Sequence, residues 1–172
     1  MEKKLFNYCV LGFVFVSVVG TLTHFTYEWS GGNYIVGLFC PISEAVFQHT
    51  KMILFPAAFF SIILYIKLGS SFNKVLPSIL LANLIGVASL PVIFYTFTGM
   101  TGSEVIAFDI VSFYFEVFLV FFLTYKFTLS KNIKLNSKVL VTITIIVCVA
   151  TIGLSELSPN IPYFNLDAPP MF

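Results

Sequence analysis

The segment Pro41-Ile-Ser-Glu-Ala-Val-Phe-Gln-His-Thr-Lys51 runs directly into the apolar stretch Met52 to Ile66, and the junction decides the fold. Ser43 is a favourable N-cap residue, and Glu44 would follow it in the first helical turn, where the helix dipole favours a carboxylate. We therefore predict a helix that begins at this point and carries polar side chains into an apolar span.

Composition places this helix in a membrane. The chain has 172 residues, of which 58% are hydrophobic and only 10% are charged. A hydrocarbon core of about 30 Å needs roughly 20 mainly apolar residues in a helix. Five such runs occur, at residues 5–26, 46–66, 75–97, 105–127 and 139–157. Because they use nearly the whole chain, we predict an all-α integral membrane bundle of five transmembrane helices, a single domain over residues 1–172 embedded in a lipid bilayer.

The distribution of lysine predicts the orientation of the bundle. All nine basic residues are lysines, and eight of them fall at the N-terminus or near the second and fourth connections: Lys3, Lys4, Lys67, Lys74, Lys126, Lys131, Lys134 and Lys138. These ends share one side, and the positive-inside rule makes that side cytoplasmic. We expect a protein of the cell (plasma) membrane with its N-terminus cytoplasmic and its C-terminus outside. The net charge of +1 gives no reason to expect a nucleic-acid partner.

Two segments are too short or too broken to span. Residues 34–40 are apolar but number only seven, so we expect an interfacial or re-entrant segment. The tail, residues 158–172, is interrupted by prolines and cannot form a sixth span. It either lies as a lid across the outer mouth of the bundle or forms a disordered end, and the sequence leaves both open.

Polar side chains collect in the outer half of the first two spans. On a helix beginning at Ser43, Glu44, Gln48 and Lys51 share one face, while His49 points to a different neighbour. In the first span, His24 and Glu28 are spaced i, i+4 near the outer surface and could share a proton or a cation.

The fourth span carries a second polar face, formed by Asp109, Ser112 and Glu116 at i, i+3, i+7. Glu116 should lie about 18 Å deep, near the bilayer midplane, and must face the bundle interior in a protonated or paired state. Asp109 and Lys51 come to similar depths, about 8 to 10 Å, so we predict that they pair. The predicted ligand-binding residues are therefore His24, Glu28, Glu44, Gln48, His49, Lys51, Asp109, Ser112 and Glu116.

Three segments of this sequence resemble a family of small bacterial multi-pass membrane proteins of unknown function: Gly20 to Glu28, Gly37 to Lys51 and Phe108 to Ser112. The most specific feature is a Pro-x-x-Glu-x-x-aromatic-x-His-x-Lys motif that ends on Lys51. At the positions of Ser43, Phe47 and Gln48 the family often has Asn, Trp and Glu. Loss of the second Glu argues against a purely carboxylate-based metal site. The family has no established activity, so the resemblance supports the fold and the choice of residues but supplies no reaction.

Two functions remain open. The first is binding of a cation, a small polar molecule or a lipid head group in an outward-facing polar pocket. The spans show no internal repeat of the kind found in secondary transporters, so a binding protein that works with a partner subunit or as a homo-oligomer fits better.

The alternative is an intramembrane enzyme acting on a lipid or lipid-linked substrate. In one form, His24, His49 and Glu44 bind Zn²⁺ and leave a position open for water. In another, His24 and Glu28 transfer protons without a metal. A purely structural role, in which the polar cluster only fixes helix register, is the third interpretation, so the sequence leaves enzymatic activity undecided.

Overall fold

The computed structural model describes residues 2–157 and 163–164, and this part of the chain contains helices but no strand. The helices, in order, are α1 (Glu2–Trp29), α2 (Tyr34–Phe39), α3 (Val46–His49), α4 (Lys51–Leu68), α5 (Val75–Thr101), α6 (Ile106–Leu129) and α7 (Ser137–Leu157). The predicted all-α class is confirmed.

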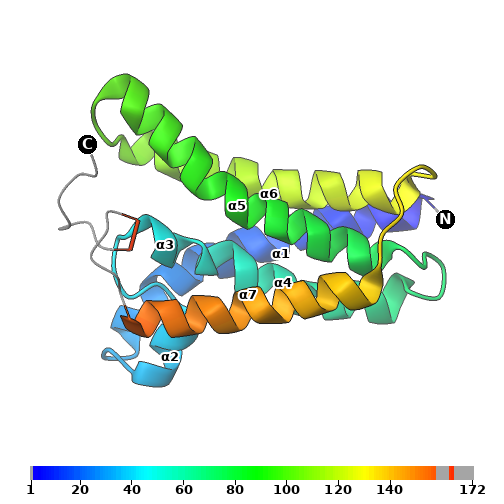
Figure 1. Ribbon diagram of the computed structural model, residues 1–172, viewed down its shortest axis with the longest axis horizontal. Coiled ribbons are helices and arrows are strands. Elements are labelled where there is room, and N and C mark those ends of the chain that lie inside the picture. The colour runs from blue at the N-terminus through cyan, green and yellow to red at the C-terminus, as the bar shows by residue number, and fades with distance from the viewer. Residues whose placement is uncertain (1, 158–162, 165–172) are drawn as a thin grey trace.

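Five helical segments in the described residues are long and apolar enough to cross a membrane: α1, α3 with α4, α5, α6 and α7. They run side by side along the long axis of the molecule (Figure 1). The N-terminus and the connections at residues 69–74 and 130–136 lie at one end, which we call the lysine-rich end. Helices α2 and α3 and the turn between α5 and α6 lie at the other, which we call the α3 end.

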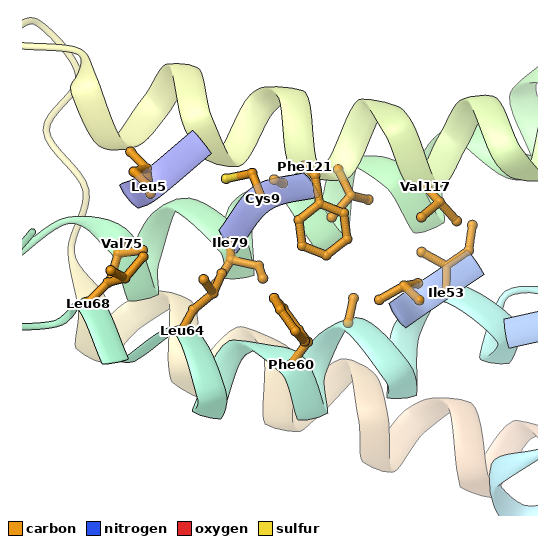
Figure 2. Close-up of a cluster of buried hydrophobic side chains, with 14 residues drawn as sticks. Leu5, Cys9, Ile53, Phe60, Leu64, Leu68, Val75, Ile79, Val117 and Phe121 are labelled. Carbon is orange, nitrogen blue, oxygen red and sulfur yellow. The ribbon is translucent and has the colours of Figure 1, made fainter. Parts of the chain in front are cut away.

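The apolar core joins α1, α4, α5 and α6 and fills the bundle from the lysine-rich end to about its middle (Figure 2). Aromatic packing is part of it, since the rings of Phe60 and Phe121 meet edge to face with centroids 5.7 Å apart. Toward the α3 end this core stops at Ile53 and Val117. The residues one position further toward that end, Met52 and Glu116, already line a cavity. The core therefore forms the floor of that cavity.

A glycine sets the distance between α1 and α4. A Cβ atom built on Gly20 would lie 2.6 Å from the backbone carbonyl oxygen of Met52, so only glycine fits at this approach. Pro56, inside α4, has no N–H to donate to the carbonyl four residues earlier, which is that of Met52. The carbonyl of Met52, which lacks the hydrogen bond from residue 56, is thus the atom against which Gly20 of α1 packs. Gly20 lies one turn before His24, and its close packing fixes where that imidazole sits.

The predicted start of the second span at Ser43 and Glu44 is wrong. Helix α3 begins only at Val46, and its N-cap residue Ala45 has no side chain that can cap. Thr50 separates α3 from α4, and its hydroxyl donates to the carbonyl of Phe47 at 2.6 Å. Glu44 therefore lies in the non-helical segment before the helix and does not share a helical face with Gln48 and Lys51.

The short segment at residues 34–40 forms α2. The side chain of Asn33 caps it by accepting a hydrogen bond from the backbone N–H of Ile35 at 3.0 Å. Of the C-terminal tail, residues 158–172, the structure describes Tyr163 and Phe164. The carbonyl of Tyr163 accepts a hydrogen bond from the N–H of Phe47 at 3.0 Å, and the ring of Phe164 packs on that of Phe47. The predicted choice between lid and disordered end concerns the remaining tail, which lies outside the described residues.

Candidate functional site

Two imidazoles and one carboxylate meet at the α3 end of the bundle. The Nε2 atoms of His24 and His49 are 3.3 Å apart, and the Oε2 atom of Glu44 lies 3.5 Å from each of them. The histidine side chains are about three-quarters buried, with 28% and 26% exposed, while that of Glu44 is 67% exposed. The three residues come from α1, the segment before α3, and α3 itself.

Local backbone geometry orients His49. Its Nδ1 atom lies 3.1 Å from the carbonyl oxygen of Ala45, one turn earlier. A carbonyl can only accept, so Nδ1 carries the proton and donates it, which leaves the lone pair of the neutral ring on Nε2. That lone pair is on the side of His24 and Glu44. A backbone carbonyl that accepts from the second ring nitrogen is the usual support of a metal-binding histidine.

The spacing of the three atoms fits a single metal ion. A tetrahedral site with metal–ligand distances of about 2.0 to 2.2 Å holds its ligand atoms about 3.3 to 3.6 Å from one another. The three observed separations are 3.3, 3.5 and 3.5 Å. Among the described residues, His24, Glu44 and His49 form the group of histidine, cysteine and acidic side chains close enough to hold an ion. Three protein ligands leave a fourth position open.

A cavity of about 510 Å³ lies beside this triad. That volume is within the range of pockets that hold small molecules. Its walls come from α1, the segment before α3, α3, α4, α5 and α6. The polar or ionisable lining residues are Thr21, His24, Glu44, His49, Glu104, Asp109, Ser112, Tyr114 and Glu116. The apolar lining includes Phe25, Met52, Leu90, Phe94, Ile110 and Phe113.

Two acids on α6 bring unused hydrogen-bonding capacity into this cavity. Glu116 is 1% exposed, and neither of its carboxyl oxygens has a hydrogen-bond partner in the described part of the chain. The same holds for the Oδ2 atom of Asp109, whose electrostatic neighbours are Glu104 and His49. Buried polar groups are nearly always paired, so an unpaired carboxyl group on a cavity wall marks a place where a ligand can bind.

Lys51 and Gln48 belong to a different cluster, on the side of α7. The Lys51 ammonium is fully buried and donates to the carbonyls of Gly37 and Cys40, at 2.7 and 3.1 Å, and to the hydroxyl of Ser155 at 2.7 Å. Gln48 donates to the same hydroxyl at 3.1 Å. This Lys51 cluster, made of Gln48, Lys51 and Ser155, ties α2, α3, α4 and α7 together and does not line the cavity. Burial raises the pKa of the nearby Cys40 thiol, and the charge of Lys51 partly opposes that rise.

Comparison with family models gives one match, to a family of unknown function, DUF6512, over residues 1–169. The chain belongs to this family. No curated protein and no solved structure matches it. For this DUF6512 protein, function has to be argued from the site itself.

One predicted pair is wrong in this DUF6512 protein. Among the described residues, Lys51 does not pair with Asp109, because its ammonium points toward α2 and α7 while Asp109 lies on the cavity wall. A proton or cation shared by His24 and Glu28 stays a prediction; in the described residues the carboxylate near His24 is that of Glu44, and the Glu28 side chain is exposed. Matching depth was satisfied by Lys51 and Asp109, and i, i+4 spacing by His24 and Glu28. They do not fix which face of the bundle a side chain occupies.

The remaining predicted residues fall on the cavity wall: His24, Glu44, His49, Asp109, Ser112 and Glu116. As expected, His49 points to a different neighbour from Gln48 and Lys51, namely His24 on α1. Sequence reasoning missed Glu104, Thr21 and Tyr114 as lining residues and Ser155 as a partner of Lys51. Glu104 carried a signal, since it is an acid just before the polar face of α6. The hydroxyl residues carried none, because Thr and Ser on apolar helices usually serve packing.

Proposed function

We propose that this protein is a multi-pass membrane protein that binds one divalent transition-metal ion, Zn²⁺ being the best fit, through His24, Glu44 and His49. The single observation that carries the proposal is the triangle of ligand atoms, with edges of 3.3, 3.5 and 3.5 Å. Two imidazoles with one carboxylate suit Zn²⁺ far better than Mg²⁺ or Ca²⁺, which prefer all-oxygen sites.

Sidedness follows from charge. The lysine-rich end carries eight of the nine basic residues and by the positive-inside rule faces the cytoplasm. The α3 end, with the triad and the cavity, then faces outward. The ion would reach the triad from the outside, through the exposed Glu44 side. We therefore place the binding activity in the outer leaflet of the cell membrane.

The test is the metal content of the detergent-purified protein after equilibration with Zn²⁺ and removal of free metal. We expect about one equivalent in the wild type and at least about a tenfold loss of affinity for His24→Ala, His49→Ala and Glu44→Ala. Glu28→Ala is the matched control, since it removes an exposed carboxylate outside the triad. Circular dichroism and gel filtration report whether each variant folds.

A wild type that holds no metal contradicts the proposal. So does an equivalent of metal that survives all three triad substitutions, because the ion then binds elsewhere.

A metal-dependent enzyme is the second candidate, and Glu116 favours it. An open metal position beside a water-accessible cavity can activate a bound water molecule, and an unpaired carboxyl group on the same cavity wall can exchange a proton with a reacting molecule. Glu116→Gln separates the two candidates. It would leave metal affinity unchanged in both, and in the enzyme alone it would abolish turnover of a substrate.

A further inference from the structure

A second, smaller depression adjoins the cavity on the outer surface of the bundle. Its volume is about 240 Å³, and Ser17, Val18, Thr21, Leu22 and Tyr114 line it. Two of these residues, Thr21 and Tyr114, also line the main cavity. The two hollows therefore lie on opposite sides of one thin partition between α1 and α6.

A single hydrogen bond closes this partition. The hydroxyl groups of Thr21 on α1 and Tyr114 on α6 are 3.2 Å apart, and the bond is exposed. Thr21 donates its hydroxyl proton to the carbonyl of Ser17 at 2.8 Å, so Tyr114 is the donor in this bond. Exposed hydrogen bonds of this kind are weak, because water can replace either partner, and side-chain rotation of an exposed residue takes nanoseconds. The partition can therefore open without movement of the helices.

The outer flank of this depression is apolar and exposed. Val18 and Leu22 on α1 are 53% and 47% exposed, and Phe118 on α6 is 51% exposed. Both helices are long and apolar enough to cross a membrane. In a bilayer these side chains face acyl chains, so the depression opens toward lipid rather than toward water.

The polar groups of the main cavity select a type of head group. Its described lining holds four carboxyl groups, those of Glu44, Glu104, Asp109 and Glu116, and no Lys or Arg. The divalent ion proposed at the triad offsets at most two of these four carboxyl charges, so an anionic head beside Asp109 and Glu116 would still meet like charge, which is costly in a partly desolvated site. Hydroxyl, amide and amine groups would instead donate to the unpaired oxygens of Asp109 and Glu116.

We propose that the cavity binds an amphiphile that comes from the bilayer between α1 and α6. Its head is neutral or cationic and carries hydroxyl, amide or amine donors, and its apolar chain leaves past Thr21 and Tyr114 into the depression at Val18 and Leu22. This deepens the proposed function by naming a ligand class for the same site. It rests on the metal proposal only in that the head group lies beside the bound ion.

The experiment uses two photoactivatable probes of equal chain length, each with a diazirine in the chain: a long-chain amino alcohol and a fatty acid. The full-length protein is placed in phosphatidylcholine nanodiscs, irradiated, and the adducts are mapped by mass spectrometry. We expect the amino alcohol to label residues of the α1–α6 depression and cavity, and an excess of unlabelled amino alcohol to suppress this labelling. The fatty acid should label these residues about tenfold less, because of the acidic lining.

Background labelling by lipid-exposed contact is measured on α7. Ile146 and Val149, 59% and 64% exposed, face outward on that helix, so their labelling should not be suppressed by competitor. Thr21→Phe should block the partition and abolish cavity adducts, while Ile146→Phe should leave them unchanged. Tyr114→Phe removes the hydroxyl and its hydrogen bond but keeps the ring. It should therefore increase labelling of the cavity if this bond holds the partition closed.

Adducts spread equally over α7 and the α1–α6 seam overturn the proposal, as does labelling of the cavity that Thr21→Phe does not alter. Stronger labelling by the fatty acid overturns the assignment of the head group. Metal content is measured on the same samples. If the protein holds no metal but the amino alcohol still labels the cavity and competitor suppresses that labelling, the proposed function alone fails. If the protein holds metal but competitor does not suppress the labelling, this inference alone fails.

Discussion

Replacing Gly20 by alanine should weaken metal binding without touching a ligand. A Cβ at this position would lie 2.6 Å from the carbonyl oxygen of Met52, whereas ordinary carbon–oxygen contacts are about 3.3 Å. The partner atom is backbone, so α1 has to move away from α4 by about 0.7 Å. His24 lies one turn further along α1 and would move with it, away from His49.

The size of the effect follows from the tolerance of metal sites. Ligand distances usually stay within about 0.2 Å of their ideal values, so a shift of this size breaks the triangle unless the protein pays to restore it. Overpacking of this kind costs about 1 to 3 kcal/mol, and we expect Zn²⁺ affinity to fall about 5- to 150-fold.

Isothermal titration of the detergent-purified variant with Zn²⁺ measures this loss. Gly153→Ala is the matched control, since a Cβ there meets no atom within 4 Å and the residue also lies in a helix. That substitution should leave affinity unchanged and raise helix stability by up to about 1 kcal/mol. If Gly20→Ala binds Zn²⁺ as tightly as Gly153→Ala does, the approach of α1 to α4 does not position His24, and the reasoning fails.

Further predictions concern the Lys51 cluster and the acid-base behaviour of the site. Lys51→Met should lower the free energy of unfolding by about 2 to 4 kcal/mol, because the buried carbonyls of Gly37 and Cys40 lose their donor. Lys67→Met, on the exposed face of the same helix, should not lower it. Thermal denaturation in detergent measures both, and equal losses would show that burial of the amine is unimportant. In a variant whose sole thiol is Cys40, that thiol should react with iodoacetamide more slowly than a free thiol, because burial raises its pKa and disfavours the reactive thiolate. The rate should rise with pH with a midpoint above pH 9.0. A midpoint at or below pH 9.0 would contradict this. Bound Zn²⁺ should be released on acidification, as protons compete for the imidazoles, and a metal content independent of pH would show that histidines do not hold it.

Much of the fold could be predicted from composition because a bilayer allows little else. Apolar runs of about 20 residues form helices wherever they occur, and their number and approximate limits can be read from the chain. The start of α3 was missed because a good N-cap residue, Ser43, was present but not used. Glu44 instead lies outside the helix, 3.5 Å from His24 on α1, and no local propensity reports such a contact.

Sequence reasoning grouped His24, Glu44 and His49 as one open alternative, and the structure brings these three together, whereas the predicted pair of Lys51 with Asp109 is wrong. His24, Glu44 and His49 stood out because ionisable residues are rare in apolar spans. Their partners depend on helix rotation and on which helices are neighbours. Lys51 and Asp109 show this, since their matching depths suggested a pair and the bundle places them on different faces. Depth gives the position of a side chain along the membrane normal, and pairing also depends on its position within the membrane plane.

The position of α7 has a consequence for biosynthesis. Every described residue that lines the cavity lies between Thr21 and Glu116, so α7 contributes none of them. The triad and the described cavity walls therefore precede α7 in the order of translation. Ser155 follows on α7 and accepts one of the hydrogen bonds that the buried Lys51 ammonium donates. Synthesis of the final helix thus adds a further acceptor to an ammonium group that already donates to the carbonyls of Gly37 and Cys40, beside a pocket whose described walls precede that helix in the chain.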